Sequence, residues 1–257
     1  MLTAYAKQAA AVANAELHKL ARDPTELFSR AVQPVLWLVI FGQVFSQVRG
    51  IPTGSVGYLA FMTPGILAQS VLFSAIFYGI AVIWERDLGI VQKFLVSPAP
   101  RSTLVLGRAI SSTVRSLCQM VFVYGLSYLL HIQLRFGVFA LAGVVLAVML
   151  GSAIFSTFSL IVACLVKSRE RFMGIGQVLT MPLFFASNAI YPLTLMPSWL
   201  RVVSKVNPLS YQVDALRTLM IVGSSTSFGL GKDFLMQFIA FAVLVTVATK
   251  LYPTIVT

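Results

Sequence analysis

Long stretches without charged residues constrain this chain more than any other feature of its sequence. The segment from Gly50 to Trp84 contains no Lys, Arg, Asp or Glu, and neither does the segment from Ser116 to Leu134. About 20 apolar helical residues are enough to cross the hydrocarbon core of a bilayer. Charged residues make up only 11% of the chain, whereas soluble domains carry about 25%. The sequence therefore predicts an all-α integral membrane protein.

The apolar runs divide into six predicted spans within one transmembrane domain, residues 24–257. These spans cover residues 27–48, 58–83, 103–131, 137–166, 172–190 and 234–252. An alanine-rich segment, residues 1–23, precedes them and is predicted to form an amphipathic helix on the membrane surface. This topology places 13 Lys and Arg residues on the inner side and 6 on the outer side. Because basic residues favour the cytoplasmic side, we expect both termini in the cytosol.

The net charge of +11 does not indicate a nucleic-acid-binding protein. The basic residues lie at the ends of apolar runs and form no separate basic domain, so we expect no nucleic acid as a partner. His18 and His131 lie in different segments, and Cys118 and Cys164 both fall within apolar runs. We therefore expect neither a metal site nor a disulfide.

A charged stretch, residues 84–101, separates the second and third predicted spans. Its apolar residues recur at helical spacing and share one face: Trp84, Leu88, Val91 and Leu95. We predict an amphipathic surface helix over residues 84–97 that a soluble partner could hold; the alternative is a surface linker whose apolar side rests on lipid. The residues predicted to contact the partner are Glu85, Arg86, Asp87, Leu88, Val91 and Phe94.

Three arginines follow at intervals of seven residues, which places them on one stripe of the third predicted span. They are Arg101, Arg108 and Arg115. We expect the arginines to face either the lipid headgroups or the soluble partner, and we favour a surface anchor at the headgroups for Arg108. Arg115 lies deeper, and the choice between these two roles is left open for it.

The segment between the fifth and sixth predicted spans, residues 191–222, is too apolar for a free loop. Pro197 opens a short helix, and Asn207 followed by Pro208 is typical of the N-cap and first residue of a second one. Neither helix is long enough to cross, so we predict a re-entrant or interfacial helical hairpin on the outer face. Asp214 and Arg217 form an i,i+3 pair, which we expect to be exposed. A role in gating release is predicted for Tyr191, Trp199, Asn207, Pro208, Tyr211, Asp214 and Arg217.

Several short motifs resemble those of the type-2 ABC exporter permeases. The first group follows the second predicted span: Glu85-Arg86-Asp87 with Gly89, then Leu95-Val96-Ser97-Pro98. The second group lies in and before the outer hairpin: Pro182-Leu183-Phe184-Phe185, Tyr191-Pro192, Pro197-Ser198-Trp199-Leu200 and Asn207-Pro208-Leu209-Ser210-Tyr211. The resemblance covers nearly the whole chain. It is nearest to the daunorubicin-type drug exporters, with the lipo-oligosaccharide exporters nearby.

The resemblance implies an N-terminal interfacial helix, six spans, a cytoplasmic coupling helix and a re-entrant outer hairpin in a prokaryotic-type plasma (inner) membrane. It also implies two permease subunits, identical or related, together with two ABC ATPase subunits that bind ATP and Mg. The coupling role would fall on the helix that begins at Glu85. Asp87 departs from the Glu that is commoner in the family, but the carboxylate is kept.

The sequence lacks the groups that other energy sources would need. Gly231-Lys232 is not a phosphate-binding loop, because Asp233 follows it where Ser or Thr is required. All eight acidic residues fall outside the predicted spans, whereas proton- or sodium-coupled carriers keep carboxylates within the membrane. We therefore expect no enzymatic activity and no cofactor in this chain, with ATP hydrolysis on a partner. The alternative from another class is a membrane enzyme or assembly factor that does not transport.

Aromatic and uncharged polar residues of the predicted spans are candidates for a substrate path. They are Phe61, Gln69, Phe73, Phe77, Phe155, Phe184, Phe185 and Asn188. Such a path suits export of an amphipathic drug-like or lipid-like molecule, and the alternative substrates are a lipid-linked glycan or a lipo-oligosaccharide. Packing within the helix bundle is the simpler explanation for most of these residues.

Overall fold

The computed structural model describes residues 32–47, 56–89, 101–166 and 168–252, with the side chains of 101–104 left undescribed. Within these ranges the chain forms helices and no strand; one isolated antiparallel bridge joins Leu134 to Ile221. The helices are η1 (Leu36–Phe41), α3 (Gly42–Ser46), α4 (Tyr58–Phe77), α5 (Gly79–Asp87), α7 (Arg101–Leu129), α8 (Val138–Leu165), α9 (Arg169–Phe185), η2 (Leu193–Leu195), α10 (Ser198–Val206), α11 (Pro208–Met220) and α12 (Leu230–Leu251). The predicted interfacial helix at 1–23 lies outside the described residues.

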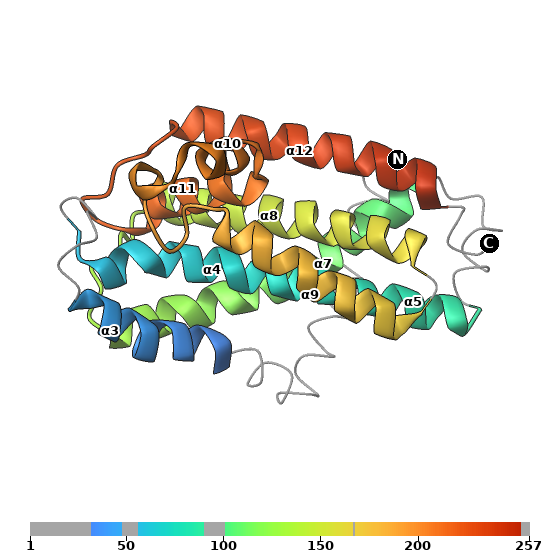
Figure 1. The fold of residues 1–257 in the computed structure, drawn as a ribbon, viewed down its shortest axis with the longest axis horizontal. Coiled ribbons are helices and arrows are strands. Elements are labelled where there is room, and N and C mark those ends of the chain that lie inside the picture. The colour runs from blue at the N-terminus through green and yellow to red at the C-terminus, as the bar shows by residue number, and fades with distance from the viewer. Residues whose placement is uncertain (1–31, 48–55, 90–100, 167, 253–257) are drawn as a thin grey trace.

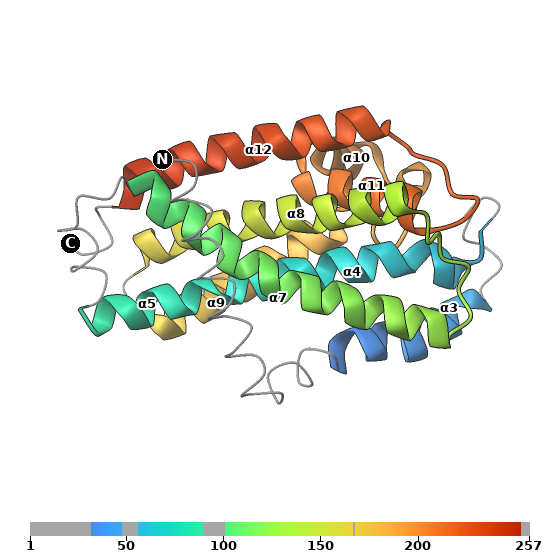
Figure 2. The same ribbon diagram turned by 180° about the vertical axis from the view of Figure 1, so that it is seen from behind.

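The long helices run side by side along the longest axis of the molecule (Figures 1 and 2). Helices α10 and α11 lie toward the end that also holds α3, and α5 lies at the opposite end. The two stretches that the sequence singles out are therefore far apart, near opposite ends of the bundle.

Three helices in the described residues are long and apolar enough to cross a membrane by length and composition. They are α4 together with α5 (Tyr58–Asp87), α8 (Val138–Leu165) and α12 (Leu230–Leu251). In the first, 72% of the most apolar window is buried inside the protein, against 11% in α12. Helix α4 is therefore the centre of the bundle, whereas α12 turns most of its apolar surface outward. The apolar helix at Val32–Ser46 is shorter, and α7 carries the arginine stripe.

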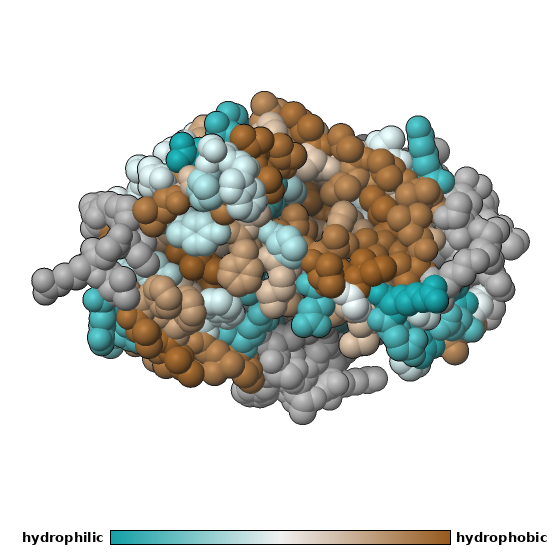
Figure 3. Space-filling model, viewed as in Figure 1, coloured by the Kyte–Doolittle hydropathy of each residue, from teal (hydrophilic) through white to brown (hydrophobic). Residues whose placement is uncertain are grey.

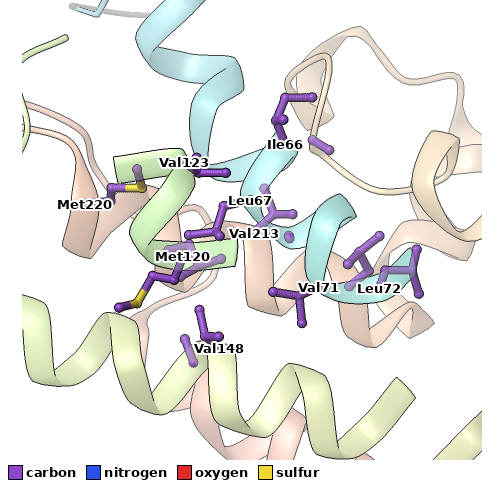
Figure 4. Packing of buried hydrophobic residues seen from close by; sticks show 14 of the residues in the cluster. Ile66, Leu67, Val71, Leu72, Met120, Val123, Val148, Val213 and Met220 are labelled. Atoms are coloured by element: carbon purple, nitrogen blue, oxygen red, sulfur yellow. The ribbon is translucent and has the colours of Figure 1, made fainter. Parts of the chain in front are cut away.

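The core lies where α4 meets α7, α8 and α11 (Figure 4). Leu67 and Val71 of α4 pack there with Met120 of α7, Val148 of α8 and Val213 of α11, all within one buried cluster. Helix α11, although only 13 residues long, is buried along most of its length. Within the predicted hairpin, α11 is therefore part of the core, whereas α10 lies at the surface with Ser204 as its only buried residue.

Glycine allows close helix contacts at two places in this core. A Cβ on Gly65 of α4 would lie 2.5 Å from the carbonyl oxygen of Ala189. A Cβ on Gly151 of α8 would lie 2.1 Å from the side-chain nitrogen of Gln212 on α11. Real Cβ atoms are not found at such distances. At Gly65 the obstacle is backbone, so α4 approaches Ala189 because this position lacks a side chain, whereas a side chain at position 151 would displace the end of Gln212.

Candidate functional site

The described part of the predicted coupling segment, residues 84–89, contains the end of α5 and its C-terminal cap. Glu85, Arg86 and Asp87 form its last turn, and Leu88 is its C-terminal cap. Trp84 and Leu88 are 50% and 67% exposed, so two apolar side chains stand at the surface here. The remaining predicted contacts, Val91 and Phe94, and residues 90–97 of the predicted helix lie outside the described residues.

The carboxylate of Glu85 forms an ion pair with the guanidinium of Arg108 on α7. The side chains are 33% and 13% exposed, respectively, so the pair is partly shielded from water. The expectation that Arg108 reaches lipid headgroups is therefore wrong. Arg115 also contacts this part of the chain, since its guanidinium carbon lies 5.1 Å from the ring centre of Tyr78, the N-cap of α5.

Asp87 joins the end of α5 to the start of α9. One carboxylate oxygen accepts hydrogen bonds from Nη2 and Nε of Arg169, at 2.9 and 3.1 Å. The other accepts from Arg86 Nη2 at 3.2 Å. The guanidinium of Arg169 also lies 3.7 Å from the ring centre of Trp84, in a cation–π contact.

Arg86 completes these connections by donating to the carbonyl oxygen of Val166, at 3.0 Å. Val166 is the C-terminal cap of α8, where carbonyls lack helical partners and a cation is favourable. We name Glu85, Arg86, Asp87, Arg108 and Arg169 the charged cluster. It ties the end of α5 to α7, to the end of α8 and to the start of α9. Hydrophilic side chains gather in this part of the surface, while apolar ones follow α12 (Figure 3).

At the other end of the bundle, Arg217 of α11 is buried, with 5% of its side chain exposed. Its Nη2 donates to the carbonyl oxygen of Asn188 at 2.6 Å, and its Nε donates to that of Phe61 at 3.2 Å. Its guanidinium carbon lies 3.8 Å from the Phe61 ring centre. Arg217 therefore joins α11 to α4 and to the turn that follows α9.

Asp214 is fully buried and has other partners. Its Oδ2 accepts from the Thr226 hydroxyl at 2.8 Å and from the backbone N–H groups of Ser227 and Phe228 at 2.8 and 3.0 Å. The expectation of an exposed Asp214–Arg217 pair is therefore wrong. Helix α11 packs between α4, α8 and α12, so its polar residues are buried and bind partners on different elements.

The other predicted gate residues occupy the junctions of the hairpin. Asn207 caps α11 by accepting from the N–H of Leu209 at 3.0 Å, and its Nδ2 donates to Leu183 of α9 at 2.7 Å. Pro208 is the first residue of α11. The Tyr191 hydroxyl donates to the Phe185 carbonyl, the Tyr211 hydroxyl donates to the Lys205 carbonyl at 2.5 Å, and Trp199 is 67% exposed.

The predicted substrate-path residues do not gather in one place. Phe61 and Asn188 belong to the Arg217 junction, and Phe73 and Phe77 stack on each other with ring centres 6.0 Å apart. Phe184 is fully buried against Trp37, with Phe185 beside it. Gln69 is 2% exposed in the core. Phe185 is 43% exposed, and the buried amides of Gln69 and Asn188 each keep side-chain atoms without a hydrogen-bond partner.

Phe155 alone among them lines a pocket between α8, α9, α11 and α12. This pocket has a volume of about 340 Å³. Its walls are apolar: Ile154, Phe155, Phe158, Leu183, Pro208, Ala240, Val243 and Leu244. Val243 is 56% exposed, so one wall of the pocket reaches the outer surface of the bundle. Such a pocket accommodates an apolar group and offers no charged side chain.

Sequence comparison bears directly on the role of these sites. The model of the ABC-2 type transporter family matches residues 7–221, which contain the charged cluster and all of α11. The chain belongs to the ABC-2 type transporter family. Its relatives include the transport permease ycf38 of Cyanophora paradoxa, 32% identical over 203 residues, which are 78% of this chain and 70% of that protein.

Two bacterial relatives of this ABC-2 chain are more distant. The doxorubicin resistance permease DrrC of Mycobacterium tuberculosis is 25% identical over 211 residues, 82% of this chain and 75% of that protein. The inner membrane transport permease YadH of Escherichia coli is 24% identical over 237 residues, 87% of this chain and 88% of that protein. The predicted type-2 ABC permease is thereby confirmed: the chain is a membrane transport subunit of a family that works with ABC ATPases.

Two partners of the charged cluster, Arg108 and Arg169, were missed as site residues from the sequence. A signal for them exists, since both arginines lie on the predicted inner side together with Glu85 and Asp87. A search for acid–base pairs on one side of the membrane would have found them.

Proposed function

We propose that this chain is the membrane subunit of an ATP-driven exporter and that the end of α5 receives the motion of an ABC ATPase. The observation that carries this proposal is the charged cluster. Its hydrogen bonds connect one short turn to the ends of three other helices. A displacement of that turn is therefore passed to α5, α7, α8 and α9 together.

The surface beside the cluster suits a protein partner. Trp84 and Leu88 are exposed next to the charged groups, and burial of such a side chain contributes about 1.5–3 kcal/mol. Charges around an apolar contact fix its orientation and favour one partner over others. In this proposal, two ATPase subunits carry ATP and Mg and dock on two permease subunits, which are identical or related.

The proposed topology has six spans, with the charged cluster and both termini on the cytosolic side and the α10–α11 hairpin toward the outside. The basic asymmetry of the sequence and the placement of the two stretches at opposite ends support it. Single cysteines at Glu170 and Ser198, both exposed, test it when Cys118 and Cys164 are replaced by Ala. An impermeant thiol reagent applied outside intact cells should label position 198 and spare position 170; the reverse pattern would overturn this orientation.

The proposed substrate is an amphipathic drug-like or lipid-like molecule moved out of the cytosol. The name of the relative DrrC refers to doxorubicin resistance, and doxorubicin is a suitable first compound to test. The uncharged pocket at Phe155 supports an apolar portion in the substrate. ATP-dependent accumulation in inside-out vesicles should exceed that of vesicles without the chain, whereas equal accumulation contradicts drug export.

The coupling proposal is tested by Leu88→Ser combined with Phe94→Ser. We expect a normal level of the protein in the membrane, loss of ATPase co-purification and loss of export. The matched control is Val206→Ser, because Val206 is 77% exposed on α10 in the opposite half of the bundle. Continued ATPase binding and export in the double variant would show that residues 84–97 are only a surface linker.

A further inference from the structure

The first turn of α12 brings a second buried carboxyl group next to Asp214. Asp233 is fully buried, and its carboxyl lies within reach of the Asp214 carboxyl and the Thr226 hydroxyl. Neither of its oxygens has a hydrogen-bond partner, and neither has Oδ1 of Asp214. Buried polar atoms are nearly always paired, so three unpaired carboxyl oxygens at one place need a ligand.

The fully buried amide of Gln237 provides another oxygen without a hydrogen-bond donor. Gln237 lies one turn beyond Asp233 on α12, and its Nε2 donates to the backbone oxygen of Asp233 at 3.3 Å. Its Oε1 has no partner. Four buried side-chain oxygens around this turn therefore have no hydrogen-bond donor: Oδ1 of Asp214, both carboxyl oxygens of Asp233 and Oε1 of Gln237.

The hydrogen bonds of the two carboxyl groups indicate which of them is ionised and which is neutral. Oδ2 of Asp214 accepts three hydrogen bonds, from Thr226, Ser227 and Phe228, and such donors stabilise an ionised carboxylate. The two backbone N–H groups donate to Asp214 and not to Asp233, and two adjacent buried carboxylates cannot both ionise without strong repulsion. A neutral Asp233 can donate its O–H to the free Oδ1 of Asp214, so that one proton pairs two of the three unpaired carboxyl oxygens.

We propose that Asp214 and Asp233 form a proton-binding site in which one proton is shared between a carboxylic acid and a carboxylate. With the proton bound, Asp214 holds the segment 226–228 over α11 and α12. When the proton leaves to solvent, the two carboxylates repel each other and the hold on that segment weakens. The prediction that all eight acidic residues lie outside the spans is wrong for Asp233, because α12, which is long and apolar enough to cross a membrane, begins at Leu230 and not at residue 234.

Few other ionisable groups face this site. On α11, the guanidinium of Arg217 is bound to two carbonyls, and the Tyr211 hydroxyl is bound to Lys205. Helix α8 packs against both α11 and α12 and has no Asp, Glu, Lys, Arg or His between 138 and 165. The remaining ionisable groups on α4, α10 and α12 are Tyr58, Arg201, Lys205, Lys232 and Lys250, the last of which lies in the final turn of α12. None of them donates a hydrogen bond to either carboxyl.

Infrared difference spectroscopy of the full chain in lipid nanodiscs tests the proposal. At neutral pH we expect the carbonyl band of a protonated carboxylic acid, which disappears on raising the pH and is absent in Asp233→Asn. The matched control is Glu170→Gln, which removes an exposed acid and should leave the band unchanged. Asp233→Glu keeps the carboxyl group, so it should shift the band.

A second measurement follows the segment that Asp214 holds. Amide exchange at Ser227 and Phe228 should show lost protection at high pH in the wild type, and protection at all pH values in Asp233→Asn, whose amide donates permanently. The absence of an acid band at neutral pH, or its persistence in Asp233→Asn, would overturn the proposal. A band that disappears on adding sodium ions at constant pH would also overturn it, because the ligand would then be a cation.

Discussion

Arg108 of α7 forms an ion pair with Glu85 of α5, across the charged stretch that separates their helices in the sequence. The pair is partly buried, so each charge depends on the other more than an exposed pair would. Within the charged cluster, this ion pair connects α5 to α7, the helix that follows the coupling segment in the sequence.

We predict that the Glu85–Arg108 pair couples stability to transport. Glu85→Gln and Arg108→Gln should each lower the thermal stability of the purified protein, because each leaves a partly buried charge without its partner. The double variant should lose less than the sum of the two, with an interaction energy of about 1–3 kcal/mol. The double-mutant cycle is measured by thermal unfolding of the wild type, the two single variants and the double variant, and export is measured for the same four proteins. Additive losses would mean that the two side chains act independently.

Arg217 gives a prediction that separates charge from shape. Arg217→Lys keeps the charge, but a single ammonium group cannot reproduce the planar arrangement that binds two carbonyls and lies over the Phe61 ring. We expect a loss of about 1.5–3 kcal/mol for each charged hydrogen bond removed, measured by thermal unfolding and by protein level in the membrane. Arg135→Lys, at an exposed position, is the control. An Arg217→Lys protein as stable as the control would show that only the charge matters.

Replacement of glycine by alanine should change the stability of the protein in opposite directions at two positions. Gly65→Ala should destabilise the protein by about 1–3 kcal/mol, because its Cβ meets the backbone of Ala189, which cannot move aside alone. Gly107→Ala should stabilise it by about 0.5–1 kcal/mol, because a Cβ there meets nothing within 4 Å and alanine favours a helix. Unfolding temperatures of the two variants, compared with the wild type, check both. Equal effects would contradict the close contact between α4 and Ala189.

The helical class and the family could be predicted because charge-free runs and short motifs are properties of neighbouring residues. The start of α11 was predictable for the same reason, since Asn207 and Pro208 act locally as cap and first residue. The partners of Asp214 and Arg217 were not predictable in this way. They depend on how α11 packs between α4, α8 and α12. An i,i+3 spacing describes two residues of one helix and does not predict which residues of other helices contact them.

The pocket at Phe155 provides the last prediction. Ala240 of α12 lines it, and Ala240→Trp should fill much of the space with a side chain of suitable polarity. If an apolar part of the substrate binds there, ATP-dependent accumulation in inside-out vesicles should fall while ATPase co-purification stays normal. Ile239→Trp is the matched control, because Ile239 is the next residue along, is 46% exposed and does not line the pocket. Equal transport by the two variants would remove the pocket from the substrate path and leave it as a space filled by lipid chains.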